Sequence, residues 1–311
     1  MKVPRAAAAA IVALSACGIV HDRSVRDDLR EESARVGLAL VEARSERIAV
    51  IPFDGTTRYY KAGYSQPLTA AFGRNGTLVA WHRSSIWGPT ELIVTSISGR
   101  VVTRALSPTP DFYPGAITEE AGLLEFWGTM PGNHRAGLYW AALDLSKIGF
   151  IDSLQTGDEP FGDWSPDGSK LVYSKSGVVR VFDMRSQRST PIVRGRDPTW
   201  APNGKWISFR GPDELAALIT IDGTSVPWSV GRRKPCSPLR WSPDGRFVSF
   251  SERRHFPLLG GYYRVVICRV SDGRDVAIRT LGISWPDLLG FHWILRYREF
   301  CHDCTPSEPF S

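Results

Sequence analysis

Hydrophobic and polar positions alternate with a period of two in several short stretches of the chain. Apolar side chains recur two residues apart in the pairs Leu171 and Tyr173, Ile207 and Phe209, and Val248 and Phe250. This period is that of a β-strand, in which successive side chains point to opposite faces. The pattern therefore predicts short strands, each with one buried face.

These strands belong to an internal repeat. Three segments align without gaps: Trp164–Tyr173, Trp200–Phe209 and Trp241–Phe250. Phe72–Trp81 keeps the aromatic ends and Asn-Gly, and Ile117–Phe126 keeps only the apolar positions. A sixth unit, around Trp285, is faint. From Phe72 onward the first residues of the six units are 45, 47, 36, 41 and 44 residues apart, close to the 40 to 45 residues of a four-stranded propeller blade.

Each repeat carries a turn motif with a physical reason for every column. Proline presets φ at the first inner position of a tight turn, Asp or Asn tolerates the second and bonds nearby backbone, and glycine supplies the positive φ that releases the chain. In the three gapless segments, the tryptophan and these turn residues are Trp164, Pro166, Asp167 and Gly168; Trp200, Pro202, Asn203 and Gly204; and Trp241, Pro243, Asp244 and Gly245. We expect a structural role for all twelve, rather than a metal-binding or acid/base role for the acidic ones.

A second hairpin with Ser-Gly or Asp-Gly follows in three units, at 97–100, 221–224 and 270–274. With it, the repeats resemble the TolB-like, WD-type propeller repeats of bacterial periplasmic proteins. The resemblance spans residues 48–300 and is strongest over 161–280. It implies an all-β fold, a β-propeller of four-stranded blades, and the six repeat units imply six blades. We expect Arg47–Phe53 to close the ring beside Phe291–Tyr297, since a closed ring leaves fewer exposed edges.

The N-terminus is typical of an export signal. Lys2 and Arg5 precede an apolar stretch, 6–16, that is too short to span a membrane. Leu-Ser-Ala-Cys, ending at Cys17, resembles the lipobox of bacterial lipoproteins, which implies cleavage after residue 16 and lipidation of Cys17. By the same resemblance, Gly18 favours the outer membrane of a Gram-negative envelope; an ordinary secreted protein is the alternative.

The sequence thus divides into a signal peptide (1–16), a lipidated Cys with a charged tether (17–47), the propeller (48–300) and a C-terminal tail (301–311). Within the tether, Val25, Leu29, Val36 and Leu40 are spaced by 4, 7 and 4 residues, which is compatible with one face of a helix. We expect a short helix that connects the anchor to the propeller.

Charge and composition narrow the function. The formal charge is +6, with 31 Arg and 7 Lys scattered along the chain, and it falls to +4 when the signal is removed. Scattered charge favours a solvated surface over a nucleic-acid-binding stripe. We therefore expect no nucleic-acid partner.

A search for catalytic motifs finds no nucleophile elbow, no zinc-protease His pair and no phosphate-binding loop. We therefore predict no catalytic residues, no metal and no cofactor. A site in the central channel would need charged groups converging from several blades, for which the candidates are Asp54, Asp111, Glu125, Asp163 and Asp197. Three or more such groups at one cavity would favour this alternative.

Cys17 apart, the chain has four cysteines, Cys236, Cys268, Cys301 and Cys304, which permit three disulfide connectivities. A local disulfide between Cys301 and Cys304 is the simplest interpretation; a redox pair or half a zinc site remain alternatives.

The function predicted from these features is that of a lipid-anchored envelope propeller, a non-catalytic scaffold that binds a protein or peptide. The alternative is a propeller that binds a small ligand or acts as an enzyme in its central channel.

Overall fold

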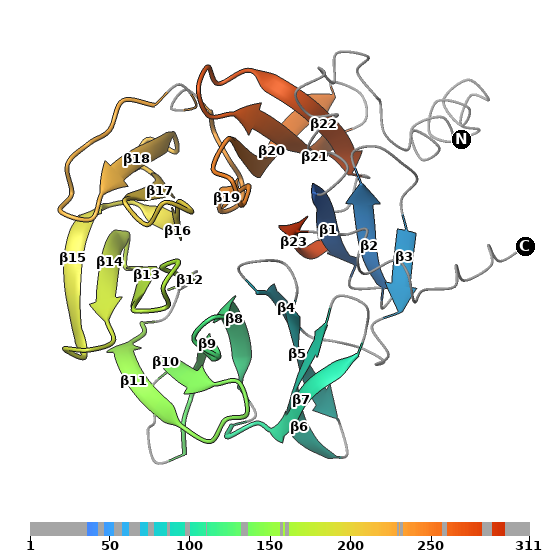
Figure 1. Cartoon of the computed structure of the whole chain (residues 1–311), viewed down its shortest axis with the longest axis vertical. Helices are drawn as coiled ribbons and strands as arrows, with labels where there is room; N and C mark the ends of the chain where they lie inside the picture. The colour runs from blue at the N-terminus through green and yellow to red at the C-terminus, as the bar shows by residue number, and fades with distance from the viewer. Residues whose placement is uncertain are drawn as a thin grey trace, which may run out of the picture.

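The structure is a computed structural model that describes residues 36–295 except 43–46, 53–57, 62–68, 74–77, 86–87, 97–99, 110, 132–135, 156–157, 159–161, 229, 231–232, 257–259 and 282–287. The described part consists of strands and turns without a helix. Its six antiparallel sheets stand around a central axis as the blades of a β-propeller (Figure 1). The all-β propeller fold predicted from the repeats is therefore confirmed.

The blades follow one another along the chain and are numbered here in that order. Blade 1 contains β4 (Thr69–Phe72), β5 (Leu78–Ser85), β6 (Gly88–Ser96) and β7 (Val101–Leu106). Blade 2 contains β8 (Tyr113–Thr118), β9 (Leu123–Gly128), β10 (Gly137–Ala142) and β11 (Ile148–Ser153). Blade 3 contains β12 (Gly162–Trp164), β13 (Lys170–Lys175), β14 (Val178–Asp183) and β15 (Arg188–Arg194).

The second half of the ring continues in the same way. Blade 4 contains β16 (Arg196–Trp200), β17 (Trp206–Arg210) and β18 (Ala216–Thr220). Blade 5 contains β19 (Arg240–Trp241), β20 (Phe247–Phe256), β21 (Gly260–Arg269) and β22 (Asp275–Leu281). Blade 6 combines β23 (Leu288–Leu295) from the C-terminal side with β1 (Val36–Glu42), β2 (Arg47–Pro52) and β3 (Arg58–Lys61) from the N-terminal side.

Five sheets have four strands, but blade 4 has three, so the expectation of six four-stranded blades is wrong in this detail. The chain after β18 begins to pair, because the Val226 N–H donates to the Leu218 carbonyl at 2.8 Å and Ser225 bridges Ile219. Pro227 follows at once and has no N–H to extend the ladder. The fourth strand therefore stops after a single bridge.

The ring closes through strands from both ends of the chain, but in a different order from the one expected. β1 pairs with β23 along Val36–Glu42, and β2 pairs with the other side of β1. The described part of the predicted strand Arg47–Phe53, which is Arg47–Pro52, thus lies in blade 6, one position further from β23 than expected. The predicted helical tether is wrong for Val36–Glu42, because these residues form a strand of blade 6.

The hydrophobic core lies between blades, which corrects the expectation of one buried face per strand. In β13, Leu171, Val172 and Tyr173 are all fully buried. Leu171 and Tyr173 pack in the cluster between blades 2 and 3, whereas Val172 packs between blades 3 and 4. Since each blade is enclosed by two neighbours, both faces of its inner strands are covered by apolar side chains.

The outer edges of four blades share a β-bulge. The pairing of the third strand with the fourth skips one residue of the fourth, and the skipped residues are Val102, Ile151, Ile192 and Val276. A bulge twists an edge strand and interrupts its regular hydrogen-bonding groups. These edges are therefore poorly suited to pair with strands of another chain.

Candidate functional site at the channel mouth

The turn motifs of blades 3, 4 and 5 form the same hydrogen bonds. Gly168, Gly204 and Gly245 have φ of 67°, 68° and 73°. Their N–H groups donate to the carbonyls of Ser165, Ala201 and Ser242 at 2.9, 3.0 and 2.9 Å. The side chains of Asp167, Asn203 and Asp244 each accept a backbone N–H two residues later, at 3.1, 2.9 and 3.0 Å. These polar side chains are thus occupied in holding the turn.

Two of the motif tryptophans connect neighbouring blades through their indole N–H groups. The buried Trp164 donates its indole N–H to the Ala116 carbonyl of blade 2 at 3.2 Å. Trp241 donates to the Ser208 hydroxyl of blade 4 at 2.8 Å. Each of these two indoles reaches back into the preceding blade, so Trp164 and Trp241 help to fix the blade-to-blade packing.

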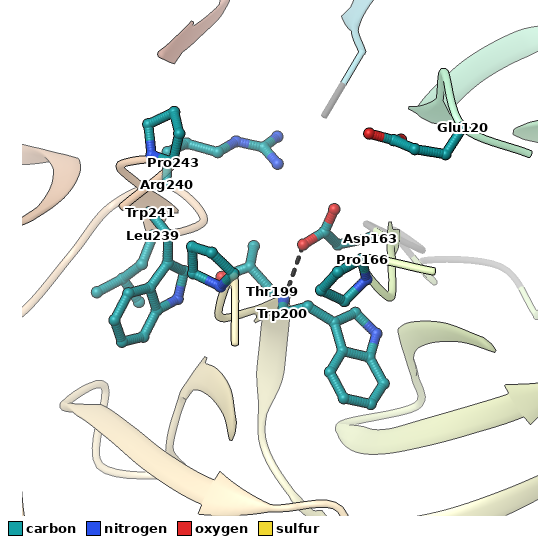
Figure 2. A pocket seen from close by; sticks show the side chains of 10 residues that line it. Glu120, Asp163, Pro166, Thr199, Trp200, Leu239, Arg240, Trp241 and Pro243 are labelled. Atoms are coloured by element: carbon teal, nitrogen blue, oxygen red, sulfur yellow. Dashed lines mark hydrogen bonds between the residues drawn. The ribbon is translucent and has the colours of Figure 1, made fainter. Parts of the chain in front are cut away.

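Because side chains alternate along a strand, the residue before each motif tryptophan points away from that core and toward the next blade, where it borders a cavity. These residues are Asp163, Thr199 and Arg240, and Glu120 joins them from the turn of blade 2 (Figure 2). They surround a cavity of about 170 Å³ whose wall also contains the turn prolines. Those prolines are Pro166, Pro202 and Pro243. Trp200, Leu239 and Trp241 complete the lining.

The charged groups at the cavity are fixed to different degrees. Asp163 is only 8% exposed, and its Oδ2 accepts the backbone N–H of Trp200 at 2.8 Å, which ties blade 3 to blade 4. Thr199 is buried and its hydroxyl bonds that of Ser208 at 2.7 Å. Glu120 is exposed and Arg240 is half-buried. In Figure 2, both carboxylates and the Arg240 guanidinium point toward the same space.

Of the channel candidates named from the sequence, the structure places only Asp163 at this cavity. Asp111 is exposed elsewhere, Glu125 is fully buried, and Asp197 is buried in an ion pair with Arg210. Asp54 lies outside the described residues. Sequence reasoning missed Glu120 and Arg240, although the repeat alignment could have revealed both. Arg240 directly precedes a motif tryptophan, and Glu120 lies at the position of the turn in blade 2.

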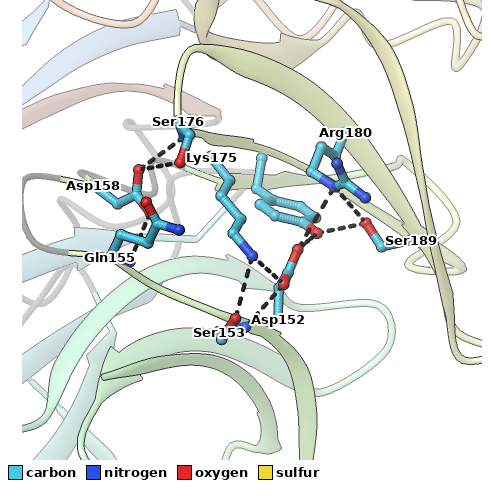
Figure 3. A network of polar contacts seen from close by, with 9 residues as sticks. Asp152, Ser153, Gln155, Asp158, Lys175, Ser176, Arg180 and Ser189 are labelled. Carbon is cyan, nitrogen blue, oxygen red and sulfur yellow. Dashed lines mark hydrogen bonds and ion pairs between the residues drawn. The ribbon is translucent and has the colours of Figure 1, made fainter. Parts of the chain in front are cut away.

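A second polar cluster lies at the outer end of the interface between blades 2 and 3 (Figure 3). Asp152 of β11 accepts hydrogen bonds from Lys175 Nζ at 2.6 Å and from the Tyr173 hydroxyl at 2.7 Å, and Arg180 Nε lies 3.6 Å away. Burial opposes ionisation, but the hydrogen bonds from Lys175 and Tyr173 hold the pKa of Asp152 below its ordinary value. This cluster joins two blades.

Other sequence predictions fall on different parts of the chain. Cys17, Cys301 and Cys304 lie outside the described residues. Cys236 and Cys268 are present as free thiols. Within the described ranges, no group of three or more His, Cys, Asp or Glu side chains is arranged to hold a metal ion. No described helix is long and apolar enough to cross a membrane.

Comparison with known proteins identifies relatives in fold only. The chain matches no protein-family model and no curated protein sequence. It is similar to the structure of TolB from Acinetobacter baumannii, with a TM-score of 0.54, 15% identity and coverage of 84% of this chain and 66% of TolB. The structure of a nidogen/laminin complex aligns with a TM-score of 0.56, 11% identity and coverage of 84% and 99%.

A third neighbour is a putative 6-phosphogluconolactonase from Bacteroides uniformis, with a TM-score of 0.50, 14% identity and coverage of 81% of this chain and 84% of that one. The expected likeness to TolB is thus confirmed at the level of the β-propeller fold. The chain spans just under two thirds of the Acinetobacter TolB chain. Identities this low leave the function to be argued from the site.

Proposed function

We propose that this protein is a non-catalytic propeller scaffold of the cell envelope that binds a protein or peptide at the channel mouth. The observation that carries the proposal is the small size of the cavity, about 170 Å³, which is bordered by Glu120, Asp163 and Arg240 from three different blades. The hydrogen bonds within the turns of blades 3, 4 and 5 hold the surface around this cavity in place. Such a preorganised rim suits the recognition of a projecting group on a larger partner.

The size of the cavity favours a peptide over a free cofactor. Ligand pockets for drug-sized molecules measure roughly 300–1,000 Å³, whereas this one measures about 170 Å³. It has room for one side chain or a chain end, while the remainder of the partner covers the surrounding turns. The prolines and tryptophans of the wall offer rigid apolar contact.

The charges define what that group carries. Asp163 and Glu120 present carboxylates, which attract an ammonium or guanidinium, and Arg240 presents a fork of donors for a carboxylate. A segment with a basic and an acidic group close together satisfies both. We infer such a dipolar segment, for example a chain start followed by an acidic residue, as the preferred ligand.

We further propose that the propeller is held at the membrane by a lipid on Cys17, on the periplasmic side of the outer membrane if the cell is Gram-negative. The support is the order of charged head, apolar stretch, small residues and Cys at the N-terminus. Several acyl chains together give stable anchoring. Metabolic labelling with a radioactive fatty acid should label the wild type and leave Cys17→Ser unlabelled.

A small-ligand or enzymatic function is the second candidate. Three charged groups at one cavity are what a channel site requires, and a fold neighbour is described as a putative 6-phosphogluconolactonase. A thermal-shift screen with sugar phosphates, amino acids and short peptides separates the two. Stabilisation by a sugar phosphate alone would favour this second function.

Crosslinked pull-down from envelope extract tests the leading proposal. We expect a specific partner to be recovered by the mature wild type and recovery to fall at least tenfold with Arg240→Ala or Asp163→Asn. The asparagine retains an acceptor for the Trp200 N–H while it removes the charge. Arg274→Ala, which removes an exposed arginine of the blade 5 hairpin, is the matched control. Equal recovery with Arg240→Ala would contradict the proposal.

A further inference from the structure

Glu125 occupies a column of the repeat that holds small or apolar side chains in the other aligned blades. The same position is filled by Ala80, Val172, Ser208 and Ser249, and all five residues are fully buried. The propeller fold therefore has no need of a carboxyl group there. An ionisable group in the blade core has to be explained by something other than packing.

The structure makes room for this side chain at the inner end of the interface between blades 2 and 3. A Cβ atom on Gly115 of β8 would lie 1.8 Å from Glu125 Oε2, and one on Gly162 of β12 would lie 3.3 Å from the same atom. The β8–β9 pairing is irregular between Pro114 and Ile117, opposite Glu125. Two glycines and an irregular strand thus surround the carboxyl.

The carboxyl has little to stabilise a negative charge. Oε2 accepts the Ala116 N–H at 2.9 Å, and Oε1 is buried without a hydrogen-bond partner in the described part of the chain. Burial raises the pKa of Glu125 to about 8, and the hydrogen bond from Ala116 lowers it only in part. A neutral carboxylic acid is the form that this environment favours.

Among the described residues, the elements packed around Glu125 supply no compensating charge. β8 contributes Gly115 and the Ala116 N–H, and Leu171 of β13 lies beside Gly162. From β10, Trp140 lies directly opposite in the ladder. On β12, the residue after Gly162 is Asp163, which is also an acid. Its Oδ2 accepts the Trp200 N–H of blade 4. An ionised Glu125 would therefore need water or a displaced strand beside it.

We propose that Glu125 is a buried proton-binding site that keeps the interface between blades 2 and 3 closed while its carboxyl is protonated. When the proton leaves to solvent, the charged carboxylate loosens the packing of β8 and β12 against β9. Asp163 lies on β12 and Glu120 follows β8, so the channel mouth is affected by the same event. That effect on ligand binding rests on the proposed function, whereas the loss of stability does not.

The pH dependence of unfolding tests the proposal. Because the folded-state pKa lies above the ordinary value of 4.5, the folded protein holds a proton that the unfolded chain has lost between pH 4.5 and about 8. The contribution of Glu125 to stability is therefore full below pH 4.5, is lost as pH rises toward 8, and stays lost above it. Relative to Glu125→Gln, the wild-type unfolding equilibrium constant should rise by roughly three orders of magnitude over this range.

Denaturant titrations from pH 5 to pH 9 on wild type, Glu125→Gln and Glu125→Val supply the measurement. The valine variant carries the residue that blade 3 uses in this column, which guards against a glutamine that fails to fold. Glu214→Gln is the control, since hydrogen bonding with Arg196 keeps the pKa of Glu214 below its ordinary value. Parallel profiles for wild type and both Glu125 variants would overturn the proposal.

Infrared spectroscopy gives a second readout that needs no unfolding. At pH 7 the wild type should show the C=O band of a protonated carboxylic acid, which disappears at pH 9 and is absent from Glu125→Gln. If the wild type lacks that band at pH 7, Glu125 is ionised and the proposal is wrong. Because neither measurement involves a partner, their outcome is distinguishable from failure of the proposed binding function.

Discussion

The interface between blades 2 and 3 contains a carboxyl group at each end, and the two behave in opposite ways. At the inner end, burial without a charged partner raises the pKa of Glu125. At the outer end, Lys175 and Tyr173 hold the pKa of Asp152 low despite its burial. The chemical group is the same, so the difference arises from what the neighbouring strands present to it.

This contrast assigns different tasks to the two ends. A partly buried carboxylate that is hydrogen-bonded to a lysine and a tyrosine fastens the blades together at neutral pH. A fully buried carboxyl without such partners stabilises the interface only while it is neutral. The contribution of the outer end is therefore lost as pH falls below about 3.8, whereas that of the inner end is lost as pH rises from 4.5 toward 8, so the two together are largest near pH 4.

The largest effect is expected from the tryptophan between the two ends. Trp164→Ala removes a fully buried indole and its bond to the Ala116 carbonyl, so we expect a loss of about 3–5 kcal/mol in the free energy of unfolding. Urea unfolding at pH 7 measures it. A loss below 1 kcal/mol would show that the blades are held mainly by their polar ends.

Gly115→Ala should be the next most harmful change. Its Cβ would stand 1.8 Å from Glu125 Oε2, and displacing the carboxyl or the strand costs about 1–3 kcal/mol. In a Glu125→Ser background the obstructing oxygen is absent, so the same glycine substitution should be nearly neutral. A double-mutant cycle measures this coupling, and additive effects would contradict the packing described here.

Gly168→Ala probes where the turn of blade 3 meets blade 2. A left-handed conformation costs about 1–2 kcal/mol in alanine, and the new Cβ would lie 2.5 Å from that of Ala121. Gly204→Ala is the matched control, because φ is 68° there and the nearest contact is 3.6 Å, to Pro166. Thermal unfolding should show a greater loss for Gly168→Ala than for Gly204→Ala; equal losses would show that the contact with Ala121 yields without cost.

The smallest effect is expected at the outer end. Lys175→Met should cost about 1 kcal/mol at pH 7, because Arg180 remains near Asp152. The folded-state pKa of Asp152 is depressed, so its stabilising contribution is present above about pH 3.8 and is lost as pH falls below it. The difference between wild type and variant should therefore shrink in acid. A difference that stays constant down to pH 2 would contradict this assignment.

The sequence pattern predicted the turns and strands well wherever each position of the repeat is determined by the conformational preference of its own residue. The pattern misled at Val36–Glu42, because a spacing of four residues between Val36 and Leu40 is even and fits a strand as well as a helix. It also misplaced the turn of blade 2: the positive φ belongs to Gly122, whereas the alignment set Glu120-Ala121 against Asp-Gly. Pairing with β23 makes Val36–Glu42 a strand, and Gly122 sets the position of the turn in blade 2.

The channel site was only partly accessible from sequence. Asp163 was a candidate, but nothing local separates it from Asp111 or Asp197, whose exposure and ion pairing depend on distant strands. Arg240 could have been found by asking which residue precedes each motif tryptophan. Its convergence with Asp163 and Glu120 depends on the angle between blades, which no short-range spacing encodes.

By itself the sequence determined the repeat, its tight turns and the β-propeller class, because these follow from backbone preferences within a few residues. The tertiary structure decided which carboxyls are charged, which side chains share a cavity and which strands close the ring. Glu125 illustrates this difference between sequence and tertiary structure. Its position in the repeat can be read from the sequence, but its protonation depends on Gly115, Gly162 and the enclosing blades. Desolvation is set by everything packed around a group, and that is known only once the ring is folded.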